Sequence, residues 1–255
     1  MQIIERSFDI SFNAKLVSKW NSSNKHKNNE QINIISFEKE DICSLEMLYS
    51  KIKTSTNHDS YKKDIIESSI KTILEVLNYK HKKNLEKVKL YGAVYEDEIC
   101  GLLVANIPKV RQKSSKIIYS SRHNSAKKET EMDWLVTWMP KSNNQLKGIG
   151  KSLVGQYFST LKQDGFRDVF VKSELPEISY AQFFYENLGF EKLGDKRAKL
   201  TTKTSSQCII KDFSNNLDII IPMIATKNKI RTTINKLKHE MKPLFIDKFF
   251  KITIC

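Results

Sequence analysis

The apolar and polar positions of the chain follow two periods, and both recur along most of its length. Alternating or short continuous apolar runs predict β-strands, and these lie at 8–12, 31–37, 88–95, 99–107, 132–139, 168–172, 190 onward, 207–213, 217–225 and 249–254. Apolar positions spaced three and four residues apart predict helices, and these span 41–53, 60–79, 148–162, 178–188 and 227–242. The mixture predicts an α/β (α+β) fold.

Polar segments divide this pattern into three parts. Residues 1–30 end in a polar run and are expected to form an N-terminal extension, and residues 31–213 hold most of the predicted elements and form the main domain. Residues 214–255 are expected to form a basic C-terminal extension packed on or beside that domain. No internal repeat is visible.

The chain is strongly basic, with 43 Lys and Arg against 29 Asp and Glu and a net charge of +14. A charge of this size suits an acidic partner or a nucleic acid. Only 6 of the 43 basic residues are Arg, however, and Arg is the residue that binds phosphates and guanine bidentately. Nucleic acid is therefore a possible partner but not the favoured one.

The longest apolar run, 217–225, is about half of the roughly 20 residues that cross a bilayer. The first residues lack a basic patch followed by an apolar stretch, so we expect no secretory signal and no membrane association. The four cysteines are far apart and form no CxxC pair, which predicts neither a zinc site nor a disulfide framework. We expect a cytoplasmic protein with no bound metal.

The segment with the clearest chemistry is a strand, a loop, two glycines and a helix: WLVTWMPKSNNQLKGIGKSLV. The first backbone amides of such a helix have no intrahelical acceptor, and the helix dipole is positive at that end. Gly148 and Gly150 remove Cβ atoms, so that a bulky anion can approach the backbone. This arrangement is typical of a pyrophosphate site, although a GxG turn alone is also common without a ligand.

Two motifs in this sequence resemble those of the GNAT superfamily of acyl-CoA-dependent N-acetyltransferases. Residues 145–150 (QLKGIG) fit the pattern Q/R-x-x-G-x-G/A, and residues 181–190 (AQFFYENLGF) fit A-x-x-F-Y-x-x-x-G-F. The predicted elements of 31–213 follow the family's order. The resemblance implies a central mixed, mostly antiparallel sheet flanked by helices, with acetyl-CoA as the acyl donor.

The resemblance also implies a role for individual residues. The CoA pyrophosphate would be held by the backbone of Gln145, Leu146, Lys147, Gly148, Ile149, Gly150 and Lys151. The pantetheine arm would pair with the strand end at Thr137, Trp138 and Met139, and the N–H of Met139 would stabilise the oxyanion. Tyr185 would protonate the departing thiolate. As an alternative, Tyr185 is a core aromatic of an amphipathic helix.

An amine must lose a proton before it attacks a thioester, so a carboxylate is expected nearby. Asp133, Glu131 and Glu174 are the candidates, and each is also explained as a solvated carboxylate at a strand end. Two positions depart from the family pattern. Ile178 occupies a position where many members carry Asn, and Lys147 replaces the more frequent Arg.

Three functions remain open on this basis. The first is N-acetylation of a primary amine on a protein or peptide by direct attack in a ternary complex, and the basic charge favours an acidic one. The second is acetylation of a small-molecule amine or an aminoacyl-tRNA. The third is a catalytically inactive binding protein that uses the GNAT fold as a scaffold.

Overall fold

The computed structural model describes residues 10–12, 14–23, 30–54, 60–83, 88–106, 130–140, 142–163, 168–175, 180–192, 211–213, 216–249 and 252–254. They belong to two compact units, which are described separately. The first unit comprises residues 1–104, 134–157 and 237–255, and the second comprises 105–133 and 158–236. Strand β6 (Thr130–Thr137) and helices α3 (Ile149–Gln163) and α6 (Lys227–Met241) contribute residues to both.

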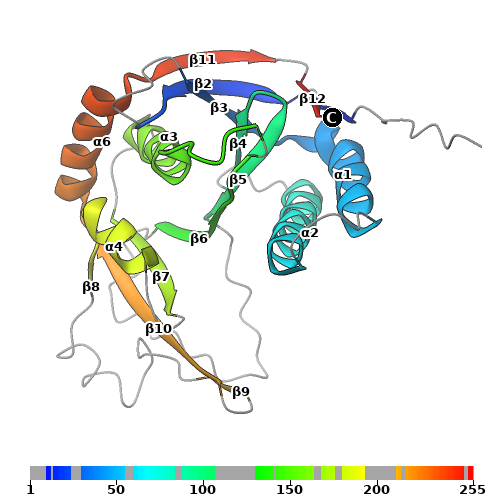
Figure 1. Ribbon diagram of the computed structural model, residues 1–255. Helices are drawn as coiled ribbons and strands as arrows, with labels where there is room; N and C mark the ends of the chain where they lie inside the picture. Colours follow the sequence, from blue (N-terminus) through cyan, green and yellow to red (C-terminus); the bar gives the residue numbers. More distant parts are fainter. Residues whose placement is uncertain are drawn as a thin grey trace, which may run out of the picture. The chain divides into compact units, whose positions relative to one another are not determined.

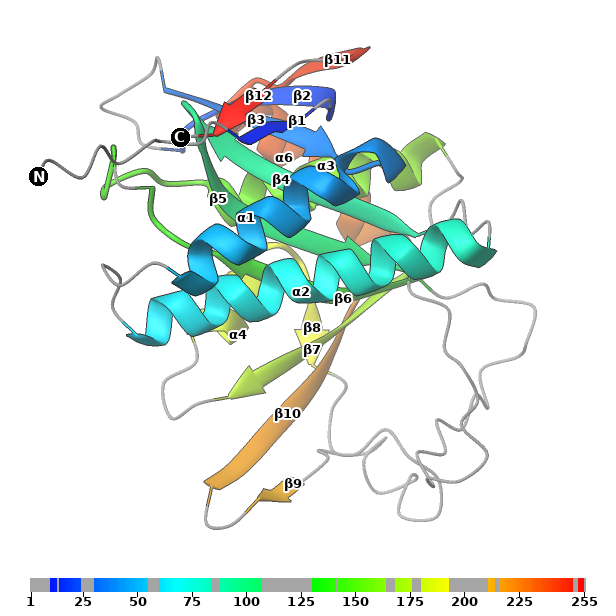
Figure 2. The same cartoon turned by 90° about the vertical axis from the view of Figure 1, so that its right-hand side faces the viewer.

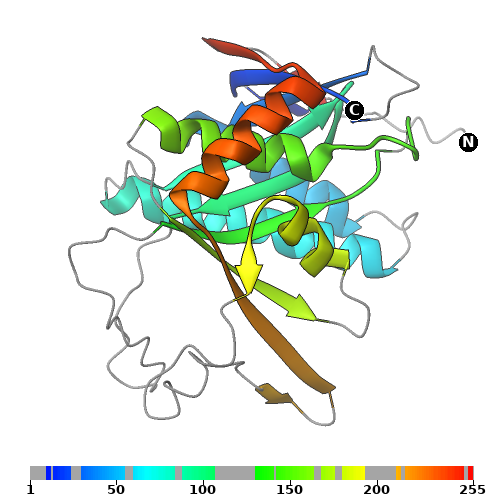
Figure 3. The same ribbon diagram turned by 90° about the vertical axis from the view of Figure 1, so that its left-hand side faces the viewer.

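The first unit is a sheet with helices on both faces. Its strand order is β11-β2-β3-β4-β5-β6, with β11 at Leu244–Phe249, β2 at Lys15–Asn21, β3 at Gln31–Ser36, β4 at Lys89–Tyr95 and β5 at Glu98–Ala105. Helices α1 (Ile42–Thr54) and α2 (Ser60–Lys83) lie side by side on one face (Figure 1, Figure 2). Helix α3 lies on the other face (Figure 3). Strands β1 (Ile10–Phe12) and β12 (Ile252–Ile254) form a separate antiparallel pair.

In the second unit the strand order is β6-β7-β10-β8. Strand β7 (Val169–Leu175) is parallel to β6, and β10 (Asn216–Ala225) is antiparallel to β7. The short strands β8 (Glu191–Lys192) and β9 (Lys211–Phe213) both pair with β10. Helix α4 (Tyr180–Asn187) follows β7 in the chain. The predicted mixed, mostly antiparallel sheet with flanking helices is therefore confirmed.

Two strands, β2 and β11, were not predicted from the sequence. The inward positions of β2 are Leu16, Ser18 and Trp20, and the buried serine interrupts the apolar alternation. Strand β11 lies at the edge of the sheet, and its Leu244 and Phe245 are both exposed. Its sequence therefore lacks the alternation of apolar and polar residues that predicts a strand. The strand predicted at 249–254 corresponds to the shorter strand β12. Residues 107–129 and 207–210 lie outside the described part of the chain. The boundaries expected after residues 30 and 213 stay a prediction.

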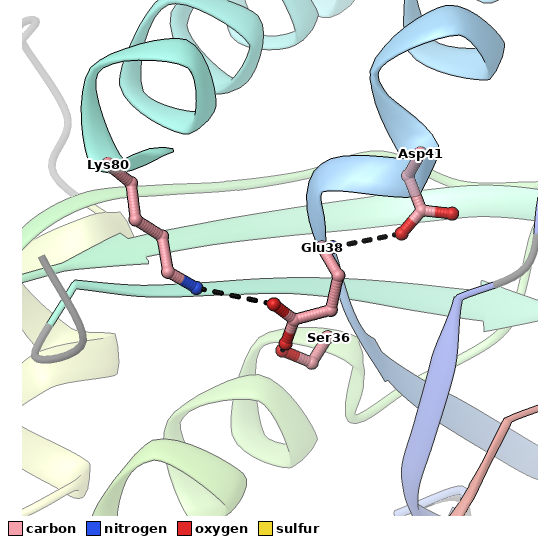
Figure 4. A network of polar contacts seen from close by, with 4 residues as sticks. All are labelled: Ser36, Glu38, Asp41 and Lys80. Atoms are coloured by element: carbon pink, nitrogen blue, oxygen red, sulfur yellow. Dashed lines mark hydrogen bonds and ion pairs between the residues drawn. The ribbon is translucent and has the colours of Figure 1, made fainter. Parts of the chain in front are cut away.

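Helix α1 begins at Ile42, directly after a short 3-10 turn. Asp41 ends a 3-10 turn, Lys39–Asp41, and its Oδ2 accepts a hydrogen bond from the backbone N–H of Glu38 at 2.9 Å. The side chain of Glu38 in turn accepts the Ser36 hydroxyl at 3.2 Å and forms an ion pair with Lys80 of α2 at 3.6 Å (Figure 4). The carboxylates thus tie the end of β3 to both helices on that face.

Helix α3 packs on β2 through an unusually close contact. A Cβ at Gly155 would lie 2.5 Å from the Trp20 ring, which is fully buried. The Trp20 Nε1 donates to Ser18 Oγ at 2.8 Å, and Ser18 Oγ donates to Gln156 Oε1 at 2.7 Å. The buried polar groups of this contact therefore satisfy one another, which removes their desolvation cost.

None of the helices in the described ranges combines the length and apolar composition needed to cross a bilayer. The same ranges contain no group of three or more His, Cys, Asp and Glu side chains that could hold a metal ion.

Substituting Gly155 by alanine is expected to destabilise the protein. Alanine normally stabilises a helix interior by about 1 kcal/mol relative to glycine. Overpacking a rigid, buried ring costs about 1–3 kcal/mol, so we expect a net loss in the free energy of unfolding, measured by urea denaturation. Trp20→Phe removes the ring atoms that would be contacted, so Gly155→Ala should cost less in that background. Equal costs in both backgrounds would contradict the packing.

Burial also predicts the reactivity of two cysteines. Desolvation, with a smaller contribution from Glu98, raises the pKa of Cys100 to about 12, whereas Cys43 is exposed. At pH 8 a thiol with such a pKa is ionised in roughly one molecule in 10⁴, so iodoacetamide should modify Cys43 and leave Cys100 unmodified. Peptide mapping by mass spectrometry checks this, with urea-unfolded protein as the control. Modification of both cysteines at the same rate in the folded protein would show that Cys100 is accessible.

Candidate functional site

The turn between β6 and α3 leads into the first backbone amides of the helix. Leu146 and Ile149 are buried and fix the turn on either side of Gly148. The first helical hydrogen bond is donated by the Ser152 N–H to the Gly148 carbonyl at 2.8 Å. The amides of Ile149, Gly150 and Lys151 precede this bond, so the geometry of a helix start leaves them without intrahelical acceptors. That these amides bind a diphosphate stays a prediction.

The backbone conformation and the packing at residue 148 both require a glycine. Its φ of 101° lies in the left-handed region, which strongly favours glycine. A Cβ there would lie 2.8 Å from Met241 Cε and 3.0 Å from the Ser23 nitrogen. From the sequence, we expected a glycine here because an anion approaches the backbone. In the structure, Ser23 and Met241 occupy the space beside it.

Three residues that the sequence did not single out hold this turn. The Lys147 carbonyl accepts hydrogen bonds from the Ser23 N–H at 3.1 Å and from the Ser22 hydroxyl at 3.0 Å. The Lys151 ammonium lies 3.5 Å from a carboxylate oxygen of Glu240, in the last turn of α6. Ser22, Ser23 and Glu240 lie in polar or basic segments far from the motif, so no pattern in the sequence marked them.

The loop before the turn is organised by Asn143. Its Oδ1 accepts the N–H of Gln145 at 3.1 Å, and its Nδ2 donates to Glu30 Oε1 at 2.8 Å. The Gln145 side chain is exposed, as is that of Lys147. The loop is thus shaped by a side chain that mimics a backbone turn.

Strand β6 pairs with β7 only in its first half. Pairing with β7 is recorded for Thr130, Glu131 and Met132, while β6 itself continues to Thr137. On the other side, the Trp138 N–H donates to the Cys100 carbonyl at 2.9 Å and extends the contact with β5. The predicted pantetheine-binding residues therefore follow the point where the β7 pairing stops, and the side chain of Met139 is 46% exposed.

In the second unit, the end of α4 forms a Schellman motif. The N–H of Phe190 donates to the Tyr185 carbonyl at 3.0 Å, the N–H of Gly189 donates to the Glu186 carbonyl at 2.9 Å, and Gly189 has φ 81°. The rings of Tyr185 and Phe190 meet edge to face at 5.5 Å. Both side chains are buried. The structure of the helix end is thus enough to explain the tyrosine, the glycine and the phenylalanine of the second motif.

The candidate carboxylates are also in the second unit. Glu131 and Asp133 are half-buried on β6 and lie two residues apart, so they share one face of the strand. The backbone of Glu174 pairs with Ile220 of β10. The side chain of Glu174, like residue Ile178, lies outside the described part of the chain. The first unit therefore holds the residues predicted to bind CoA, and the second holds Tyr185, Asp133 and Glu174.

The chain shares its fold with a protein that was solved with CoA-disulfide. Mycobacterium smegmatis RimJ in complex with CoA-disulfide matches with 9% identity over 88% of this chain and 92% of its own, at a TM-score of 0.51. A GNAT family acetyltransferase from Elizabethkingia anophelis with acetyl-CoA bound matches with 17% identity over 76% and 97%, at 0.38. The ribosomal-protein-S18-alanine N-acetyltransferase of Escherichia coli matches with 13% identity over 76% and 93%, at 0.42. No family model and no curated protein matches the sequence.

Substituting Gly148 by alanine tests why a glycine stands at this turn. The left-handed backbone costs an alanine about 1 kcal/mol or more, and the methyl group would also meet Met241. We therefore expect a lower free energy of unfolding in urea. Met241→Ala relieves the side-chain contact but not the backbone strain, so it should restore only part of the loss. Full restoration would mean that the backbone at 148 is unstrained.

Proposed function

We propose that this chain is an N-acetyltransferase that transfers the acetyl group of acetyl-CoA to a primary amine of a protein or peptide. The observation that carries the proposal is the start of α3, where the amides of Ile149, Gly150 and Lys151 follow strand β6 and the loop after it on a GNAT-like fold. Oriented amides and the positive end of a helix dipole form a site for a diphosphate.

The residues around the turn fit this ligand. Buried Leu146 and Ile149 hold the backbone in place, so the amides need little reorganisation to bind an anion. The Lys151 ammonium is shared with Glu240 at 3.5 Å, so the backbone rather than a free lysine supplies most of the attraction. RimJ of M. smegmatis, which has the same fold, was solved with CoA-disulfide, and this supports CoA as the ligand.

The strand end then positions the acyl group. Acetyl-CoA supplies an activated thioester whose carbonyl carbon is open to attack by an amine. The backbone at Thr137, the last residue of β6, and at Met139, just beyond it, pairs with the pantetheine amides as an added strand would, and the Met139 N–H donates to the carbonyl oxygen as it gains negative charge. The amine nitrogen forms a bond to the carbonyl carbon, and the bond from that carbon to sulfur breaks.

Two protons must move for the reaction to balance. The attacking amine gives one proton to a carboxylate, for which Asp133, Glu131 and Glu174 remain candidates. The departing thiolate takes one from the phenol of Tyr185. Direct attack needs no acyl-enzyme intermediate, so amine and thioester must be bound together.

The proposal predicts that acetyl-CoA raises the melting temperature and that free thiol appears when an amine-bearing peptide is added. Gly150→Glu places a negative charge against the diphosphate, so it should weaken acetyl-CoA binding more than tenfold. S-acetyl-pantetheine, which has no diphosphate, should be used equally well by both proteins. Tyr185→Phe should lower kcat by a factor of about 10² while acetyl-CoA still binds.

Each result has a distinct meaning. A protein that neither binds acetyl-CoA nor releases thiol with any amine in a peptide and small-molecule panel is not an acetyltransferase. If Gly150→Glu weakens both donors equally, the start of α3 does not bind the diphosphate.

A further inference from the structure

Strand β6 presents its side chains to two different helices. The methyl group of Thr137 lies 3.2 Å from the position of a Cβ on Gly101, beside Ile149 and Leu153 of α3. The indole of Trp134 instead donates from Nε1 to Ser69 Oγ of α2, at 3.4 Å. Because side chains of a strand alternate, odd-numbered residues here face α3 and even-numbered residues face α2.

The α2 face of β6 is apolar and uncharged at its last two positions, Trp134 and Val136. Trp134 is 37% exposed, in contrast to Met132, which is buried. Its only polar hydrogen is donated to Ser69, a fully buried residue whose hydroxyl donates to the Ile65 carbonyl at 2.6 Å. What Trp134 leaves exposed is therefore mainly the carbon surface of a ring held in a fixed orientation.

The proposed donor site determines which side is left for the acceptor. The amides of Ile149, Gly150 and Lys151 belong to α3, so the diphosphate of the donor is bound on the α3 side of the first unit. An amine that attacks the acyl group beside β6 then has the α2 side available. By the same alternation Glu131 and Asp133 lie on the α3 side, so an amine on the α2 side would give its proton to Glu174 or to water instead. Trp134 is the exposed large side chain that β6 presents there.

We infer that Trp134 is a specificity-determining residue for the acceptor and that its ring packs against an apolar or aromatic group next to the reacting amine. This inference rests on the proposed function. It names the acceptor class as a peptide amine with an apolar or aromatic neighbouring residue. The described side chains on this face of β6 carry no carboxylate to bind a polyamine, and the net charge of +14 disfavours a polycation.

The test is a panel of peptides that share one acceptor amine and differ in the neighbouring residue: Phe, Leu, Gly, Asp or Lys. We expect the wild-type protein to have its lowest KM with Phe and Leu. Trp134→Ala should raise the KM for these two about five- to tenfold, with a smaller change in kcat and little change for Gly and Asp. Trp134→Phe keeps a ring and should keep most of the preference.

Leu244→Ala is the matched control, because Leu244 is 60% exposed on β11, at the other end of the strand order of the first unit. It should leave the whole panel unchanged. The melting-temperature shift with acetyl-CoA should be the same in Trp134→Ala and wild type.

The outcomes separate this inference from the function on which it rests. If the wild type does not bind acetyl-CoA or acetylates no peptide, the proposed function is wrong. If it acetylates peptides but Trp134→Ala changes all of them equally, or changes none, Trp134 does not select the acceptor. A lowest KM with the Lys peptide that is lost in Trp134→Ala would show that the ring binds a cation, and would overturn the apolar class.

Discussion

The indole of Trp20 lies so close to Gly155 that a single methyl group there would meet it at 2.5 Å. This contact leaves α3 almost no freedom to slide or roll on β2, because the ring is buried and its nitrogen is bonded to Ser18. Gln156, the next residue of α3, accepts the Ser18 hydroxyl. The position of α3 in the first unit is therefore set jointly by the close packing of Gly155 on Trp20 and by the buried hydrogen bond between Ser18 and Gln156.

The same strand also fixes the start of the helix. Beyond Trp20, the chain continues into Ser22 and Ser23, which both donate to the Lys147 carbonyl. The middle and the first turn of α3 are thus held by one short stretch, 14–23, which pairs with β3 through β2. An anion site made of backbone amides depends on such support, because preorganised dipoles bind more strongly than dipoles that must be ordered on binding. The proposed site in the first unit relies on β2 as much as on the glycine motif.

Local patterns were enough to predict the helices and the central strands, and long-range contacts explain what they missed. The apolar stripe of α3 and the β4–β5 hairpin have strong periods, and both formed as expected. Strand β2 has a serine at an inward position, and its hydrogen bonds with Trp20 and with Gln156, 138 residues away, make that position favourable. The sequence also located the turn at Gly148 but not its neighbours Ser23 and Met241, because no short-range signal links those residues to it.

The two motifs that resemble the GNAT family therefore contain residues of two kinds. Gly148, Gly189 and Phe190 are explained by backbone conformation and by packing, and Tyr185 contributes its carbonyl and ring to the same helix cap. A protein that kept only the fold would need these residues too, so their presence says little about catalysis. The amides at the start of α3 and, outside both motifs, the exposed ring of Trp134 are different, since the turn and cap contacts described above do not involve them. Evidence for function must therefore come from these groups rather than from the glycines that first draw attention to the site.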